Sequence, residues 1–271
     1  MMVRLMLMLA ALGWLAVWRW ASPDIGCLLS AMFLLGIWAA LVSSSYEWAL
    51  LRRLGFIAHY LKSNGTLAGW LAHRTILFLW SAAKNLPVAL ILFTATLTLS
   101  VAEWLVLATD VLLLLLLLAA MDRLFDHEAA AVYARPLARL WAHRINAIML
   151  WTAIVGINFY TSHPDYRGLS WDVAAHTAAV QVECGCDVVA TLGRFAAVGQ
   201  SLAWWAAEYI LGDLTDTGER YVAWLTFLAI FGISYLVTWG YSRVLMGILS
   251  RPWCIESPSA AQYPVIAEKT S

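Results

Sequence analysis

Charged residues are scarce in this chain of 271 residues. Asp, Glu, Lys and Arg together make up 13% of it, whereas soluble domains carry roughly 25%. Hydrophobic residues reach 62%, and the mean hydropathy is +0.74. Lys and Arg equal Asp and Glu at 17 each, so the net charge favours neither nucleic acid nor an acidic partner. The scarcity of charge argues against an aromatic-rich soluble protein and predicts an all-α, polytopic transmembrane helical bundle.

Motifs of catalysis are also missing. The sequence has no P-loop, no Cys-x-x-Cys redox motif, no His-Glu-x-x-His zinc motif and no soluble catalytic domain. It lacks the inverted repeat or the pair of Gly/Pro-broken helices that is typical of secondary transporters. We therefore expect no cofactor, and we place a transporter and an integral membrane enzyme behind other membrane functions.

Long apolar runs are what the sequence does contain. Crossing the hydrocarbon core takes about 20 largely apolar residues in a helix. The first run resembles a signal peptide, but the residues after it fit a cleavage site poorly, so we interpret it as a retained span. A run of 36 residues from 86 to 121 is too long for one span and predicts two, joined near residues 100–103. About six spans are expected, at residues 5–18, 25–43, 86–101, 104–121, 145–160 and 221–245.

The segments between the spans are also expected to be largely helical. Residues 46–65 are amphipathic, as an interfacial helix or a connector packed on the bundle would be, and residues 66–85 form a second amphipathic piece. Residues 161–219 predict a helical outer loop. Its stretch 188–211 is long enough for a seventh span, but Arg194 and Glu208 favour a helix on the outer leaflet. One membrane domain, 1–249, is then followed by a tail, 250–271.

The distribution of basic residues predicts the orientation. Most Lys and Arg residues fall on one side of the six predicted spans, and the positive-inside rule makes that side cytoplasmic. We expect a multi-pass protein of a plasma or bacterial inner membrane with both termini in the cytoplasm. Amphipathic indoles collect at the lipid–water interfaces, and the tryptophans recur near the ends of the runs: Trp18, Trp20, Trp38, Trp70, Trp80, Trp104, Trp171, Trp204, Trp205 and Trp253.

Asp110 is the acidic residue placed deepest in the apolar run 86–121. A carboxylate at membrane depth costs about 2.5–3.5 kcal/mol on insertion scales, so it usually faces the bundle or a cavity. One hypothesis is an ion or proton site, with partners drawn from Thr94, Thr96, Thr98 and Asn158. The alternatives are an interhelical hydrogen bond to one of these threonines or a shallow position near the outer interface.

The cysteines allow a disulfide or a metal site. On the predicted topology Cys27, Cys184 and Cys186 lie outside, where Cys27 could pair with either of the other two. A metal held by Cys184 and Cys186 together with His176, or with His163, is a weaker alternative, because Cys-x-Cys with one distant histidine is an unspecific pattern.

The function that best fits these observations is a non-catalytic membrane subunit that anchors or assembles a larger complex. Its partners would be the lipid bilayer and either other subunits or copies of itself, and not nucleic acid. The alternative is an oligomeric ion or proton channel with Asp110 near the conduction path. Basic residues of the inner connectors are the candidates for binding a partner: Arg52, Arg53, Arg135 and Arg139.

Overall fold

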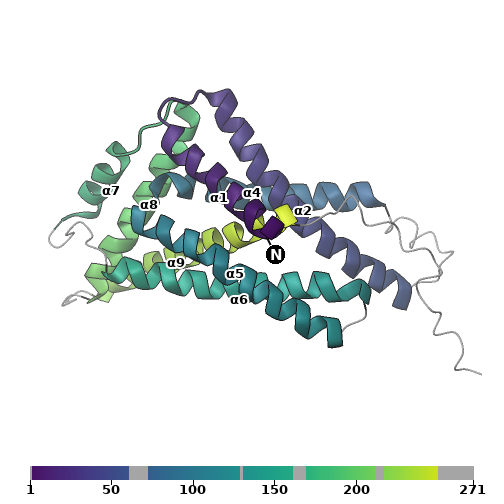
Figure 1. Ribbon diagram of the computed structural model, residues 1–271. Helices are drawn as coiled ribbons and strands as arrows, with labels where there is room; N and C mark the ends of the chain where they lie inside the picture. The colour runs from purple at the N-terminus through teal and green to yellow at the C-terminus, as the bar shows by residue number, and fades with distance from the viewer. Residues whose placement is uncertain (1, 61–72, 129–130, 161–168, 212–216, 250–271) are drawn as a thin grey trace, which may run out of the picture.

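A computed structural model describes residues 2–60, 73–128, 131–160, 169–211 and 217–249 of the chain (Figure 1). Helices make up nearly all of this described part, which contains no strand, so the predicted all-α bundle is confirmed. In the numbering of Figure 1 the helices are α1 (Met2–Ala21), α2 (Cys27–Tyr60), α4 (Arg74–Thr98), α5 (Val101–Glu128), α6 (Ala131–Tyr160), α7 (Trp171–Val180), α8 (Asp187–Leu211) and α9 (Thr217–Leu249).

The chain is a multi-pass helical membrane protein. Among the described residues, helices α1, α2, α4, α5 and α6 each contain a stretch that is long and apolar enough to cross a membrane. Large apolar side chains remain exposed along these helices, as Leu105, Leu112 and Leu116 do on α5, and such a surface suits contact with lipid. The sixth predicted span, 221–245, lies within α9. Several of the α9 side chains lie outside the described part, so that crossing stays a prediction.

The helices are longer than the predicted spans. Residues 46–60 are not a separate amphipathic helix, because α2 continues unbroken from Cys27 to Tyr60. Likewise α4 begins at Arg74 and carries residues 74–85 of the second amphipathic piece in line with the span that follows. Hydropathy marks where the lipid ends, whereas the backbone hydrogen bonds of a helix continue through polar residues. Residues 61–72 and the tail 250–271 lie outside the described part.

The break inside the long apolar run falls at Leu99 and Ser100, one residue before the predicted join. Ser100 and Glu103 form a capping box, in which the Ser100 N–H donates to the Glu103 carboxylate at 2.7 Å and the Glu103 N–H donates to Ser100 Oγ at 3.2 Å. Beyond this turn the two helices diverge. α5 packs mainly against α6 and also against α1, while α4 packs against α2, α8 and α9.

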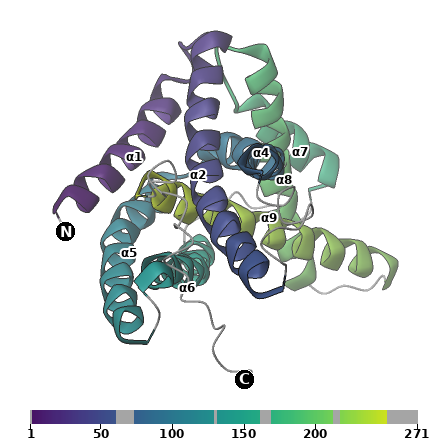
Figure 2. The ribbon, with the colours of Figure 1, turned by 90° about the vertical axis from the view of Figure 1, so that its right-hand side faces the viewer.

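The bundle has two distinct ends. The outer end, named for its predicted side, holds the turn at residues 22–26, the break at residues 99–100 and Asn158. Helices α7 and α8 gather there, and α8 runs across the direction of α4 and α6 in both Figure 1 and Figure 2. Within its described residues α8 does not qualify as a long apolar span. This placement supports the prediction of an outer helix.

A large apolar core joins the helices between the two ends, and Tyr46, Leu50 and Leu77 form a second, smaller apolar cluster between α2 and α4. Trp18 of α1 is fully buried, stacks on Phe93 of α4 at 4.3 Å between ring centroids, and donates its indole N–H to the Phe93 carbonyl. The prediction that Trp18 lies at a lipid interface was therefore wrong. Trp20, Trp80 and Trp171 are exposed, as interfacial residues would be.

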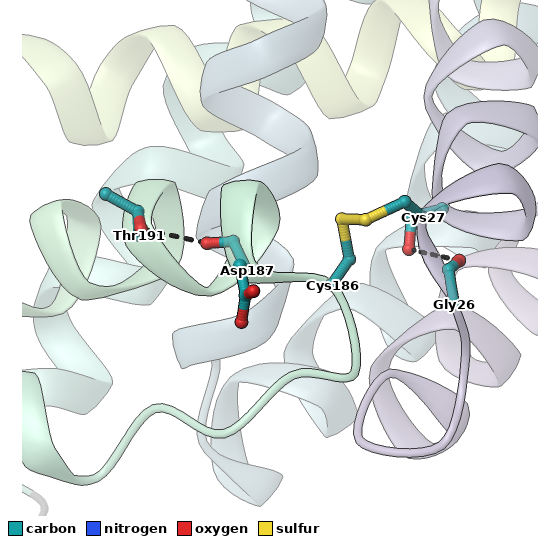
Figure 3. The surroundings of a disulfide bond; sticks show 6 residues. Gly26, Cys27, Cys186, Asp187 and Thr191 are labelled. Atoms are coloured by element: carbon teal, nitrogen blue, oxygen red, sulfur yellow. Dashed lines mark hydrogen bonds between the residues drawn. A yellow bond between two sulfur atoms is a disulfide. The ribbon is translucent and has the colours of Figure 1, made fainter.

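A disulfide between Cys27 and Cys186 joins the first turn of α2 to the residue before α8 (Figure 3). It is one of the two pairings that the sequence allowed, and Cys184 is a free thiol. Gly185 lies between Cys184 and Cys186 in the sequence, and its N–H donates to the Ser22 carbonyl at 3.0 Å. A Cβ on Gly185 would lie 2.8 Å from the carbonyl oxygens of Pro23 and Ile25, so only glycine fits this contact.

Candidate functional site

Asp110 lies in the interior of the bundle and is only 3% exposed. Its Oδ2 accepts a hydrogen bond from the Asn146 side-chain amide of α6 at 3.0 Å. Oδ1 of Asp110 and Oδ1 of Asn146 are both buried and have no partner among the described residues. Asp110 is therefore buried inside the bundle, and one oxygen of each side chain in this pair has no hydrogen-bond partner among the described residues.

The threonines that we expected to partner Asp110 do not reach it. Thr94, Thr96 and Thr98 each donate to a carbonyl of their own helix, at 2.8 to 3.1 Å. The hydrogen bond predicted between these threonines and Asp110 was wrong, because α4 and α5 diverge after the break instead of packing along each other. Asn158 donates to Glu103, not to Asp110.

Glu103 is a second buried carboxylate on α5 and is also 3% exposed. In contrast to Asp110, both of its oxygens are used. Oε1 accepts from Asn158 at 2.9 Å, and Oε2 accepts the Ser100 N–H of the capping box. Glu103 therefore has a structural role at the outer end, where it ties the start of α5 to the end of α6.

Polar groups of α6 and α9 continue from Asp110 toward the inner end. Ser242 lies 3.5 Å from the Asn146 amide and donates its hydroxyl to the His143 carbonyl at 3.4 Å. Tyr241 donates its hydroxyl to the Leu107 carbonyl at 2.9 Å. These hydrogen bonds join α5, α6 and α9 in the middle of the bundle.

A tighter polar cluster lies between α2, α4 and α9. Arg243 donates to the hydroxyl oxygen of Ser45 and, at 3.5 Å, to Asn85 Oδ1, while its guanidinium lies 4.4 Å from the Trp239 ring centroid. Asn85 donates to Ser45 Oγ at 2.7 Å and to the Ser81 carbonyl at 2.6 Å. The guanidinium of Arg243 is thus held by neutral groups, and no carboxylate among the described residues forms an ion pair with it.

The four arginines proposed to bind a partner differ in their availability. Arg139 donates to both oxygens of Glu47 at 2.8 Å, which ties α6 to α2. Arg53 is partly buried, and its Nε has no partner among the described residues. Arg52 and Arg135 are exposed. Arg139 therefore belongs to the internal packing, and Arg52 and Arg135 are the better candidates for contact with a partner.

A basic cavity of about 200 Å³ opens at the inner end, between α2, α4, α6 and α9. Five cationic side chains and a single carboxylate, Glu47, line it together with the almost fully buried imidazole of His143. Trp48 and Trp239 contribute apolar walls. Its cationic residues are Arg52, Lys84, Arg139, Arg144 and Arg243.

A larger cavity of about 440 Å³ lies nearer the outer end and is mostly apolar. It brings together Thr94, Thr98 and Asn158 with Glu103, but not Asp110. Gly199 also lines it, and a Cβ there would meet nothing within 4 Å. Gly193, by contrast, packs against Val182 and Leu97. Of these two glycines of α8, Gly193 therefore serves a contact within the chain, whereas Gly199 borders free space.

The weaker metal hypothesis finds no supporting geometry. The sulfur of Cys186 is bonded to Cys27, which removes one of the two thiolates that the site would need. In the part of the chain that the structure describes, no three His, Cys, Asp or Glu side chains come together as a metal site would require. His176 is exposed on α7, and His163 lies outside the described residues.

Comparisons with protein families, with characterised proteins and with solved structures find no match to this chain. The site therefore has to be interpreted from its own geometry.

Several residues of these sites were missed by sequence reasoning. The Ser-x-x-Glu pattern of Ser100 and Glu103 is a recognisable signature of a helix start and could have been found. Asn146 is one polar residue within the predicted span 145–160, and nothing in its spacing indicates a contact with Asp110. The contacts of Arg243 could not be predicted, because the approach of α9 to α2 and α4 depends on tertiary packing.

Proposed function

We propose that this protein is a non-catalytic membrane subunit that assembles with another protein through exposed basic residues at its inner end. The observation that carries the proposal is the contrast among the inner arginines. Arg4 and Arg139 are neutralised inside the chain by Asp122 and Glu47, each at 2.8 Å. Arg123 and Arg135, which flank the connection between α5 and α6, are exposed and have no ion pair within the described residues.

The partner that suits this surface is a protein with an acidic face. Charged groups at the rim of an interface speed association and select the partner more than they add to affinity. The polar groups in the interior are used mainly for contacts between helices, which supports a scaffold more than a catalyst. The proposal includes a single membrane domain, 1–249, with a tail, 250–271.

The test is co-purification from membranes in a mild detergent. The wild-type chain should retain a partner of fixed stoichiometry, and the Arg123→Gln/Arg135→Gln variant should lose most of it. Arg194→Gln is the matched control, since Arg194 is exposed on α8 at the outer end. Retention of the partner in the double variant, or equal loss in the control, would contradict the proposed surface.

A second candidate function, an oligomeric ion or proton channel, is favoured by one observation. Oδ1 of Asp110 and Oδ1 of Asn146 are buried and have no partner within the part of the chain that the structure describes, as groups facing a passing ion or water would be. Proteoliposomes would then show ion or proton flux that changes in Asp110→Asn. Glu103→Gln is the control, because the partners of Glu103 account for both of its oxygens. Flux that is absent or indifferent to Asp110→Asn would remove this candidate.

The proposed location is a plasma or bacterial inner membrane with both termini in the cytoplasm. The free thiol of Cys184 at the outer end offers a test. In a Cys254→Ser background, a membrane-impermeant thiol reagent added to intact cells should label Cys184. If Cys184 is labelled only in permeabilised cells, the orientation is the reverse of the one proposed.

A further inference from the structure

We infer that the basic cavity at the inner end binds a phosphate group, either the headgroup phosphate of an anionic phospholipid or a free phosphate. This inference does not depend on Arg123 and Arg135, because neither residue lines the cavity; Arg52, which is also a candidate for contact with a partner, does line it.

The charge of the cavity is the first argument. Its single carboxylate, Glu47, is already engaged by Arg139 at 2.8 Å. Within the described residues Arg52, Lys84 and Arg144 have no carboxylate partner, and Arg243 is held by neutral groups only. Like charges held together repel each other, so an anion that enters the cavity is attracted by several cations at once.

His143 supplies a second and separate argument. It is 6% exposed, it lines the cavity, and its Nδ1 is buried without a partner among the described residues. A buried polar atom without a partner is unfavourable unless a ligand or a water molecule completes its hydrogen bonding. A phosphate oxygen would accept a hydrogen bond from this nitrogen in the tautomer that carries its proton there.

The chemistry of the donors favours phosphate over other anions. Arginine offers several N–H donors in a planar fork that matches phosphate geometry, and lysine adds a compact point charge. A cavity of about 200 Å³ has room for a phosphate with part of an attached group. Trp48 and Trp239 provide apolar walls beside the charges, which suit the first carbons of the lipid acyl chains.

The depth of the cavity favours a lipid as the source. Along α6, the 19 residues from Asn158 at the outer end back to Arg139 correspond to about 28 Å at 1.5 Å per residue. The hydrocarbon core is about 30 Å thick, so the cavity lies near the headgroups of the opposite leaflet. Basic pockets between helices on the cytoplasmic side are known to receive anionic headgroups.

The test measures the melting temperature of the purified full chain in detergent as three probes are titrated. Phosphatidylglycerol should raise the melting temperature, and phosphatidylcholine should do so far less. Inorganic phosphate is the third probe: stabilisation by phosphatidylglycerol alone identifies a lipid, whereas stabilisation by phosphate at millimolar concentration identifies a free anion. Either kind of stabilisation supports the site, provided that substitution of the cavity residues weakens it.

Two variants decide that dependence. Lys84→Gln/Arg144→Gln removes two exposed cations of the cavity and should weaken the effective probe at least about tenfold, since a single charge-assisted hydrogen bond is worth roughly that much. Arg194→Gln, an exposed position on α8 outside the cavity lining, should leave the titration midpoint unchanged. Native mass spectrometry of bound lipid gives a second measurement that does not depend on stability. Absence of any response, or equal weakening in both variants, would overturn the inference.

Discussion

The outer and inner ends of the bundle are held together by different kinds of contact. At the outer end a disulfide, a glycine pressed against a turn, and a fully hydrogen-bonded carboxylate join α1, α2, α5, α6 and α8. At the inner end two partly exposed ion pairs and an open basic cavity take their place. Covalent and buried contacts stabilise strongly, whereas exposed charges contribute little. The contacts of the outer end should therefore stabilise the fold more than those of the inner end, where we propose that binding takes place.

Loss of the disulfide should have the largest effect on this comparison. Cys27→Ser/Cys186→Ser opens a link between residues 159 positions apart and should reduce stability by about 2–4 kcal/mol. The melting temperature in mild detergent measures the effect, with Cys184→Ser as a control that changes only the free thiol. If both variants have the melting temperature of the wild type, the stability of the outer end does not depend on this disulfide.

Truncation of Glu103 should come next. Glu103→Ala removes both the capping-box contact and the partner of Asn158, and we expect a loss of about 2 kcal/mol. Glu103→Gln keeps an acceptor of the same shape and should lose less than half as much. A double-mutant cycle with Asn158→Ala measures the coupling. A coupling energy near zero would show that the contact between α5 and α6 is incidental.

A methyl group on Gly185 tests the close contact at the turn. Gly185→Ala places a Cβ 2.8 Å from two backbone carbonyl oxygens, and the required shift should cost about 1–3 kcal/mol. Gly199→Ala is the matched control, since its Cβ has free space and alanine favours the helix by up to about 1 kcal/mol. The two variants should move the melting temperature in opposite directions; an equal shift would contradict the steric account.

The more exposed ion pair at the inner end should give the smallest change. The side chains of Arg4 and Asp122 are 44% and 24% exposed, and solvent screening limits their contribution, so Arg4→Gln should cost about 0.5–1 kcal/mol. The loss should shrink in high salt, which distinguishes it from the outer-end variants. A loss of stability as large as that of the Cys27→Ser/Cys186→Ser variant would contradict the distinction between the two ends.

Much of the fold could be predicted because hydropathy and helix signals are local. The apolar runs and the break near Ser100 follow from residues that are neighbours in sequence. The lengths of α2 and α4 could not be predicted, because a helix continues past the lipid wherever tertiary contacts support it. Here Ser45 of α2 and Asn85 of α4 hydrogen-bond to each other and both accept from Arg243 of α9.

The candidate sites were less predictable. The depth of Asp110 followed from its apolar neighbours, but its partner did not, because helices joined by a short turn need not pack along each other. Asn146 of α6 meets Asp110 only through the packing of α5 on α6. The inner cavity likewise gathers cations from four helices, and no stretch of sequence contains more than a few of them.

The native mass of the complex extracted in a gentle detergent tests the central proposal most directly. We predict a hetero-complex of fixed stoichiometry that dissociates when Arg123 and Arg135 are both replaced by glutamine. A closed homo-oligomer would contradict the proposal and favour the channel, and a chain that emerges alone at every detergent strength would contradict both.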